Sequence, residues 1–137
     1  MKIGFTCGAF DVLHAGHILM FQECKKVCDY LIVGLQTDPS IDRENKNKPV
    51  QSLLERQIQL NSNKYINEVV LYETEKDLEN LLYTLPISIR ILDRFYATKS
   101  FTGKDICAQK GIEIYYNDRF HDYSTTYLRK RILDAAK

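Results

Sequence analysis

Strand-like and helix-like segments alternate along this sequence, and the alternation limits the possible folds more than any other feature. Short apolar runs predict strands at residues 2–7, 30–35, 68–72, 87–92 and 112–116. Helical patterns lie between or after them at residues 17–28, 52–62, 76–85, 102–110 and 124–136. Continuous apolar strands that alternate with helices are typical of a parallel sheet covered on both faces. We therefore predict an α/β fold, a single Rossmann-like doubly wound domain of residues 1–137 with a five-stranded, mainly parallel sheet.

Composition argues against several classes of partner. The chain has 137 residues with 19 basic and 18 acidic side chains, so its net charge of +1 gives no general attraction to nucleic acid or an anionic membrane. No apolar run approaches the ~20 residues of a membrane helix, and no signal peptide precedes the first strand. The four irregularly spaced cysteines favour buried reduced thiols over metal ligation or a disulfide. We expect a cytoplasmic protein.

The segment from Gly8 to His17 joins the first predicted strand to the first predicted helix. A strand, turn and helix in this order aim unpaired backbone N–H groups and a helix dipole at one point, where an anion can bind. His14 and His17 add side-chain donors there, so we interpret the turn as a phosphate site. A metal-binding pair and two solvated loop histidines are the alternatives. No cysteine or carboxylate cluster at ligand spacing stands beside the pair, which weakens the metal alternative.

Two other candidate ligand-binding segments follow predicted strands, at residues 93–96 and 117–123. In an open α/β sheet, ligands bind beyond the carboxyl ends of the strands. Because all three segments follow strands, we expect them at the same edge of the sheet. Ser124, Thr125 and Thr126 begin the last predicted helix, where they are either ordinary N-caps or a second phosphate cradle.

Residues 8–17, Gly-Ala-Phe-Asp-Val-Leu-His-Ala-Gly-His, resemble the first signature of the small cytidylyltransferases, which make CDP-glycerol, CDP-choline or CDP-ethanolamine. Residues 119–132 resemble the second signature of that family. Lys48 and Arg56 lie where the family has a lysine and an arginine eight residues apart. The resemblance extends from residue 2 to about residue 132 and is closest, in length and layout, to bacterial glycerol-3-phosphate cytidylyltransferase.

The resemblance implies that CMP is transferred from CTP to a small phosphorylated alcohol, with glycerol 3-phosphate as the first acceptor to test. Pyrophosphate would be released, and Mg²⁺ would bind through the triphosphate. The resemblance also implies a homodimer. The expected catalytic residues are His14, His17, Lys48 and Arg119. The expected nucleotide-binding residues are Gly8, Ala9, Phe10, Gly16, Ser124, Thr125 and Thr126.

One segment departs from the family pattern. After the fourth strand the family usually has a glycine, one or two acidic residues and an aromatic, whereas this chain has Asp93, Arg94, Phe95 and Tyr96. We assign these residues, with Arg56, to acceptor or base selectivity; the alternative for Arg56 is a solvated charge on a helix face. As a fixed cation, Arg94 favours an anionic acceptor over a choline-like cation.

Several alternatives stay open at this stage. The chain could instead use ATP, as pantetheine-phosphate and heptose-phosphate adenylyltransferases with a similar turn do, or it could bind nucleotide without catalysis. His121 faces the substrate or decorates a loop, and Asp11 shapes the turn or caps the helix. Arg129 and Arg131 are expected on the outer helix surface or at a partner subunit. The polar segment 38–50 is expected to be a mobile loop that brings Lys48 over the triphosphate.

Overall fold

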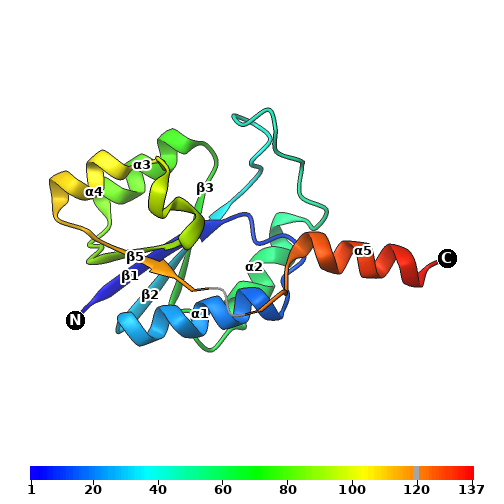
Figure 1. Ribbon diagram of the computed structural model, residues 1–137. Helices are drawn as coiled ribbons and strands as arrows, with labels where there is room; N and C mark the ends of the chain where they lie inside the picture. Colours follow the sequence, from blue (N-terminus) through cyan, green and yellow to red (C-terminus); the bar gives the residue numbers. More distant parts are fainter. Residues whose placement is uncertain (119–120) are drawn as a thin grey trace.

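The computed structural model describes residues 1–118 and 121–137 of the chain. Its five strands form one sheet in the order β3-β2-β1-β4-β5, and every neighbouring pair is parallel (Figure 1). This topology confirms the predicted α/β class and doubly wound arrangement. The strands are β1 (Ile3–Gly8), β2 (Tyr30–Gln36), β3 (Glu68–Tyr72), β4 (Ile89–Asp93) and β5 (Glu113–Asn117).

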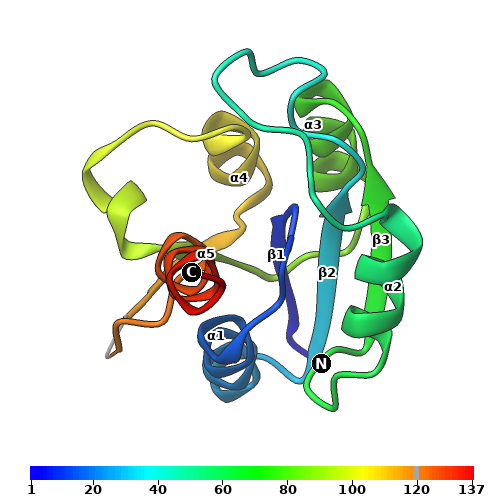
Figure 2. The same ribbon diagram turned by 90° about the vertical axis from the view of Figure 1, so that its right-hand side faces the viewer.

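Helices cover both faces of the sheet. The described helices are α1 (Ala15–Val27), α2 (Leu53–Asn61), α3 (Glu75–Thr84), α4 (Lys104–Lys110) and α5 (Thr125–Ala135). One core cluster joins the sheet to α1 and α2 through Phe21, Cys24 and Leu60. A second cluster joins the other face to α3 and α4 through Leu82 and Ile106. Figure 2 accordingly shows α3 and α4 together, away from α1.

The last helix is the least embedded part of the described chain. No residue of α5 is buried, and the helix extends away from the sheet with the C-terminus at its far end (Figure 1). The other helices pack an apolar stripe on the sheet, which supplies most of their stability. The position of α5 therefore depends on a few polar contacts near its start.

Local capping chemistry explains the start of α2. Ser52 caps the helix through its hydroxyl, which accepts from the Glu55 N–H, while the Glu55 carboxylate accepts from the Ser52 N–H. This is the expected capping box. A short 3₁₀-helix, η1 (Arg94–Thr98), was not expected. Asp93 is the N-cap of this helix. Its carboxylate accepts from the Phe95 N–H at 2.8 Å and so stabilises the first turn.

All four cysteines are free thiols, as expected, and Cys24, Cys28 and Cys107 are buried. Burial raises the pKa of the Cys24 and Cys28 thiols, so they stay protonated in the core. Within the described part of the chain, no helix combines the length and apolar character needed to cross a membrane.

Candidate active site

The turn between β1 and α1 is held together by the two histidines. His14 is the N-cap of α1, and its Nδ1 accepts from the Gly16 N–H at 3.0 Å. The Nδ1 of His17 accepts in return from the His14 N–H at 3.1 Å. This is a capping box built from imidazoles. Because backbone N–H groups can only donate, both Nδ1 atoms are unprotonated, and each neutral ring carries its proton on Nε2.

The turn itself is strained. Phe10 and Val12 have φ angles of +48° and +54°, a region that is uncommon for residues other than glycine and especially unfavourable for a β-branched one. The Val12 N–H donates to the Gln51 side chain at 2.8 Å, and the Phe10 ring packs edge-on against the His17 ring. These contacts hold the chain in a conformation that it would otherwise avoid.

The N-terminus of α5 meets this turn. Ser124 caps α5 by accepting from the Tyr127 N–H at 3.0 Å. Thr125 lies at the first helical position, with its Oγ1 3.2 Å from Nε2 of His14. The two segments resembling the family signatures, 111 residues apart in the chain, therefore touch. Two helix N-termini, with the positive ends of their dipoles, converge at this point, as a polyanion site requires.

Gly16 allows this close approach. A Cβ atom there would lie 2.8 Å from Cε1 of His14 and 2.9 Å from the carbonyl oxygen of Tyr123. It would also lie 3.0 Å from Cε1 of His121. Since the Tyr123 carbonyl belongs to the backbone, any larger residue would push the segment before α5 away from the turn.

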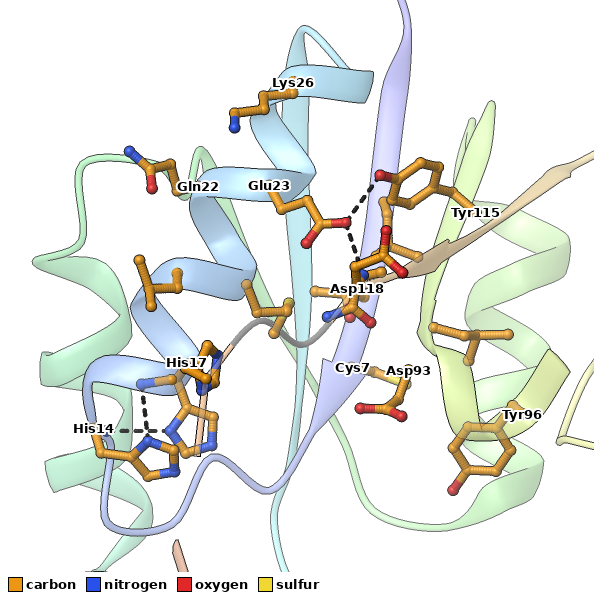
Figure 3. Close-up of a pocket in the computed structure, with 18 of the residues that line it drawn as sticks. Cys7, His14, His17, Gln22, Glu23, Lys26, Asp93, Tyr96, Tyr115 and Asp118 are labelled. Atoms are coloured by element: carbon orange, nitrogen blue, oxygen red, sulfur yellow. Dashed lines mark hydrogen bonds between the residues drawn. The ribbon is translucent and has the colours of Figure 1, made fainter. Parts of the chain in front are cut away.

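A pocket of about 610 Å³ opens between α1 and the carboxyl ends of β1, β4 and β5. His14 and His17 lie on one side of it, with Asp93 and Tyr96 on the other (Figure 3). His121 also lines the pocket, so the alternative in which it faces the ligand is the one the structure supports. The carboxyl ends of three strands thus meet at one site, as the sequence predicts.

The far end of this pocket contains Glu23, a lining residue that the sequence did not indicate. There the Glu23 carboxylate accepts from the Tyr115 hydroxyl at 2.9 Å and from the Asp118 N–H at 3.0 Å (Figure 3). The hydrogen bond to Glu23 raises the pKa of the Tyr115 phenol. Glu23 lies on the i, i+3 row of α1 that runs from His17 through Met20, and all three residues line the pocket. Nothing near Glu23 in the sequence distinguishes it from an ordinary exposed carboxylate. Further lining residues that were not expected are Thr6, Cys7, Gln22 and Lys26.

Arg56 is buried, contrary to the solvated alternative. Its side chain is 2% exposed and donates to the carbonyl oxygens of Ala9, Gln36, Thr37 and Gln51. Burial lowers the pKa of the Arg56 guanidinium, and the nearby charges of Asp11 and Asp38 act in the opposite direction. Its donors are directed at the backbone around the turn, so any influence on selectivity would pass through that backbone.

Lys48 lies in the loop between β2 and α2 and is exposed, outside the residues that line the pocket. The loop is anchored at its start, where Ser40 donates to Asp38 from both its N–H and its hydroxyl. These bonds hold the pKa of Asp38 below its ordinary value, and the positive charge of Lys48 acts in the same direction. Arg119, the other predicted catalytic cation, lies outside the described residues.

The altered segment after β4 divides into two parts. Asp93 and Tyr96 line the pocket, whereas Arg94 and Phe95 do not. Arg94 pairs with Asp118 at 2.6 Å, with side chains 60% and 42% exposed, and Phe95 is 61% exposed. The expected free cation at the ligand edge is thus balanced by a carboxylate, because β4 and β5 bring these residues side by side.

Asp11 connects the turn to two distant segments. Its carboxylate accepts from the N–H groups of Val50 and Gln51 at 2.9 Å and pairs with Arg129 of α5 at 2.8 Å. Asp11 therefore shapes the turn and does not cap α1. Arg129 was expected on the outer helix surface or at a partner subunit; it forms this ion pair instead, with its side chain 40% exposed. Arg131 lies over the ring of Tyr127.

Chemically, the site offers backbone amides from two helix N-termini and imidazole N–H groups at one end of a long pocket. Among residues 1–118 and 121–137, no group of three or more His, Cys, Asp or Glu side chains is placed to hold a metal ion. A parallel sheet with such a cradle beyond its first strand has the architecture of a nucleotidyltransferase domain.

Comparison with known proteins supports this class. The cytidylyltransferase-like family model matches residues 5–131, so the chain belongs to this family, which places it among the nucleotidyltransferases. The chain is 30% identical over 132 residues to the bifunctional protein HldE of Nitrobacter hamburgensis, covering 96% of this chain and 27% of that one. It is 33% identical to HldE of Rhodopseudomonas palustris, with the same coverage. The chain thus spans about a quarter of the length of these relatives.

Solved structures share the fold. A lipopolysaccharide core biosynthesis protein from Thermoplasma volcanium matches with a TM-score of 0.72 and 25% identity, covering 88% of this chain and 99% of that one. A bifunctional NMN adenylyltransferase/ADP ribose pyrophosphatase from Francisella tularensis matches with a TM-score of 0.63 over 98% of this chain and 42% of that one. At 11% identity, the latter shows the fold alone.

Proposed function

We propose that this chain transfers a nucleotidyl group from a nucleoside triphosphate to a small phosphorylated alcohol or sugar, releasing pyrophosphate. CTP and glycerol 3-phosphate are the first pair to test. The observation that carries the proposal is the 3.2 Å contact between Nε2 of His14 and Oγ1 of Thr125. This contact unites the two family signatures, and with them two helix N-termini, into one anion cradle.

The reaction requires little covalent work from the protein. An oxygen of the acceptor phosphate attacks the α-phosphorus, and the bond from that phosphorus to the oxygen bridging to the β-phosphate breaks. The electron pair leaves with pyrophosphate. Negative charge increases on the leaving group, where N–H donors of the cradle stabilise it. We assign His14 and His17 to this role through their Nε2 atoms, with the amides at the starts of α1 and α5.

Mg²⁺ bound through the triphosphate would neutralise charge on the phosphate oxygens. The described residues hold no ready group of metal ligands, so the ion would take most of its ligands from phosphates and water. Asp93, the first residue of the altered segment, contributes one of the carboxylates that line the pocket. We further propose that Lys48 moves over bound triphosphate, that Arg119 contributes a second cation, and that the chain forms a homodimer.

Adenylyl transfer from ATP is the second candidate. The segment Asp93–Tyr96 departs from the cytidylyltransferase pattern, which removes one argument for CTP. The likeness to a lipopolysaccharide core biosynthesis protein supports a sugar phosphate as acceptor. Both candidates use the same cradle and the same bond changes, so they differ only in the nucleoside and the acceptor.

Pyrophosphate release tests the proposal. The purified chain is incubated with Mg²⁺ and CTP, ATP, GTP or UTP, each against glycerol 3-phosphate, phosphocholine and a panel of sugar phosphates. We expect release that requires both substrates and is strongest with one nucleotide. Heat-inactivated protein and the His17→Asn variant are the controls. Tight nucleotide binding without release under any pairing would instead support a non-catalytic nucleotide-binding protein.

A further inference from the structure

Arg90, in the middle of β4, is a buried charge that the proposed chemistry does not use. Its side chain is 2% exposed, and within residues 1–118 and 121–137 it forms no ion pair. Its Nε is buried without a hydrogen-bond partner. Burying a guanidinium without a carboxylate is costly, and an apolar residue would suit this strand position better. Arg90 therefore calls for an explanation other than stability.

Besides a contact of its Nη2 with the sulfur of Cys7 at 4.0 Å, Arg90 contacts the segment that follows η1. Its Nη1 donates to the carbonyl oxygen of Thr102, and its guanidinium carbon lies 5.2 Å from the centre of the Phe101 ring. Gly103, with φ of +84°, passes close above it, since a Cβ there would lie 3.2 Å from Nη1. Arg90 therefore holds the end of the segment 94–103 against the sheet.

Phe101 carries this contact to the pocket. Its ring meets the ring of Tyr96 edge to face, with centroids 6.4 Å apart, and Tyr96 lines the pocket opposite the histidines (Figure 3). Arg90, Phe101 and Tyr96 form a column from the sheet to the pocket wall. We call it the Arg90 column. Cation–aromatic and edge-to-face contacts are directional, so they hold an aromatic ring in one orientation.

We propose that Arg90 is a positioning residue that holds Tyr96 as a wall for the nucleoside end of the triphosphate substrate. This inference rests on the proposed function. With the phosphates in the cradle at His14 and Thr125, the rest of the nucleotide extends along the pocket to its other side, where Asp93 and Tyr96 lie. An aromatic side chain there can contact a sugar or base in many orientations, provided that its ring is held still.

Three variants test the column. Arg90→Leu should weaken CTP and ATP binding, measured by calorimetry, by about fivefold, the size of one cation–aromatic contact. KM for the nucleotide should rise similarly, with kcat within about twofold, because the cradle is untouched. Phe101→Leu should behave alike, and Arg90→Lys should be intermediate since it keeps the charge but not the planar group. The control is Lys64→Leu, which removes a cation from the Tyr65 ring, a contact outside the pocket lining.

Stability and proteolysis separate positioning from a merely structural role. The urea midpoint of Arg90→Leu should equal or exceed that of the wild type, because an unpaired buried charge is removed. Trypsin should nevertheless cut after Lys99 about threefold faster or more, because the segment 94–103 is released.

Loss of stability in parallel with loss of binding in Arg90→Leu would overturn the inference in favour of a structural role. Unchanged binding and cleavage would overturn it as well, while leaving the proposed function intact. If the wild type binds no nucleoside triphosphate at all, both the proposed function and this role are refuted. The proteolysis result would then still show whether Arg90 orders its segment.

Discussion

The two walls of the pocket are built in different ways. On the β1–α1 side, the bonds that place the histidines join residues two and three positions apart, from Gly16 to His14 and from His14 to His17. On the β4–η1 side, Arg94 reaches Asp118, 24 residues away, and Arg90 contacts the sulfur of Cys7, 83 residues away. The first wall is therefore a local motif, whereas the second is assembled from distant parts of the chain.

This difference matches the pattern of family resemblance. The local wall keeps the family signature, because a capping box and a helix N-terminus depend on the residue types at a few adjacent positions. The distant wall departs from the family pattern at Asp93, Arg94 and Phe95, where a substitution can be absorbed by a new partner such as Asp118. The proposed function assigns anion binding to the local wall and substrate choice to the distant wall.

The largest expected effect is at the local wall. His14→Asn and His17→Asn each keep an acceptor at the δ position for the capping bond but lack the imidazole donor at Nε2. We expect the rate of pyrophosphate release to fall by about 10²-fold or more, as for loss of a transition-state donor. The urea midpoint should stay near that of the wild type. His14→Ala should in addition lose about 1 kcal/mol of unfolding free energy, because the cap is lost.

A metal site would give the opposite pattern. In that case a zinc chelator would abolish activity while His17→Asn left the rate unchanged. That result would favour the metal-binding alternative for His14 and His17. The local wall would then no longer be the anion-binding part of the pocket.

Asp11 is one of the residues through which the local wall contacts distant parts of the chain. Asp11→Ala should lower the free energy of unfolding by about 1–3 kcal/mol, because two amides and Arg129 lose their acceptor. Arg129→Gln should cost less than about 1 kcal/mol, since that side chain is 40% exposed. Urea denaturation measures both. Equal costs would mean that the ion pair, and not the two amides, anchors the turn.

Substitutions in the distant wall should differ in how strongly they change substrate preference. Arg94→Asp combined with Phe95→Asp should change the preference between glycerol 3-phosphate and phosphocholine by less than about threefold, since Arg94 is exposed and already paired. Tyr96→Ala should have the larger effect, because Tyr96 lines the pocket. The panel of nucleotides and acceptors, applied to both variants, measures this. A large shift from the double substitution alone would restore Arg94 as the determinant of acceptor charge.

The loop between β2 and α2, which contains Lys48, can be tested without mutation by comparing the free and the nucleotide-bound protein. Lys46 is exposed and Arg43 is partly exposed, so trypsin should cut after both in the free protein, whereas Pro49 prevents cleavage after Lys48. If Lys48 closes over bound triphosphate, CTP or ATP with Mg²⁺ should slow cleavage at these sites severalfold, while cleavage at Lys64 provides the internal reference. Identical cleavage with and without nucleotide would contradict a closing loop.

The smallest effect concerns a region outside the pocket lining. The N–H groups of Thr74 and Glu73 hydrogen-bond the Asp77 carboxylate and hold its pKa below the ordinary value of 3.8. A lowered folded-state pKa contributes stability above pH 3.8, which is lost as the pH falls through the folded-state value. Asp77→Asn should remove this acid dependence from urea unfolding and leave the activity unchanged. A change in activity would mean that substitutions outside both walls also reach the site.

Particular residues show how far sequence reasoning extends. His14, His17 and Gly16 could be placed because their spacing, the apolar strand before them and the helix after them are local signals. Ser124 and Thr125 could be placed at a helix start, but their contact with His14 rested on the expectation that strand ends share an edge. Glu23 was missed because nothing near it in the sequence distinguishes it from an ordinary surface carboxylate, whereas Asn117 and Asp118 belong to the segment expected at the ligand edge.

The sequence by itself determined the α/β class, the parallel sheet, the edge that carries the site and the cradle at the first turn. These properties follow from hydrophobic periodicity and capping chemistry, which act over a few residues. Only the tertiary structure decided that Arg56 is buried against backbone carbonyls, that Asp118 neutralises Arg94, and that Arg129 pairs with Asp11. The partners of a long charged side chain depend on which distant segments the fold brings within reach, and local sequence carries no record of that.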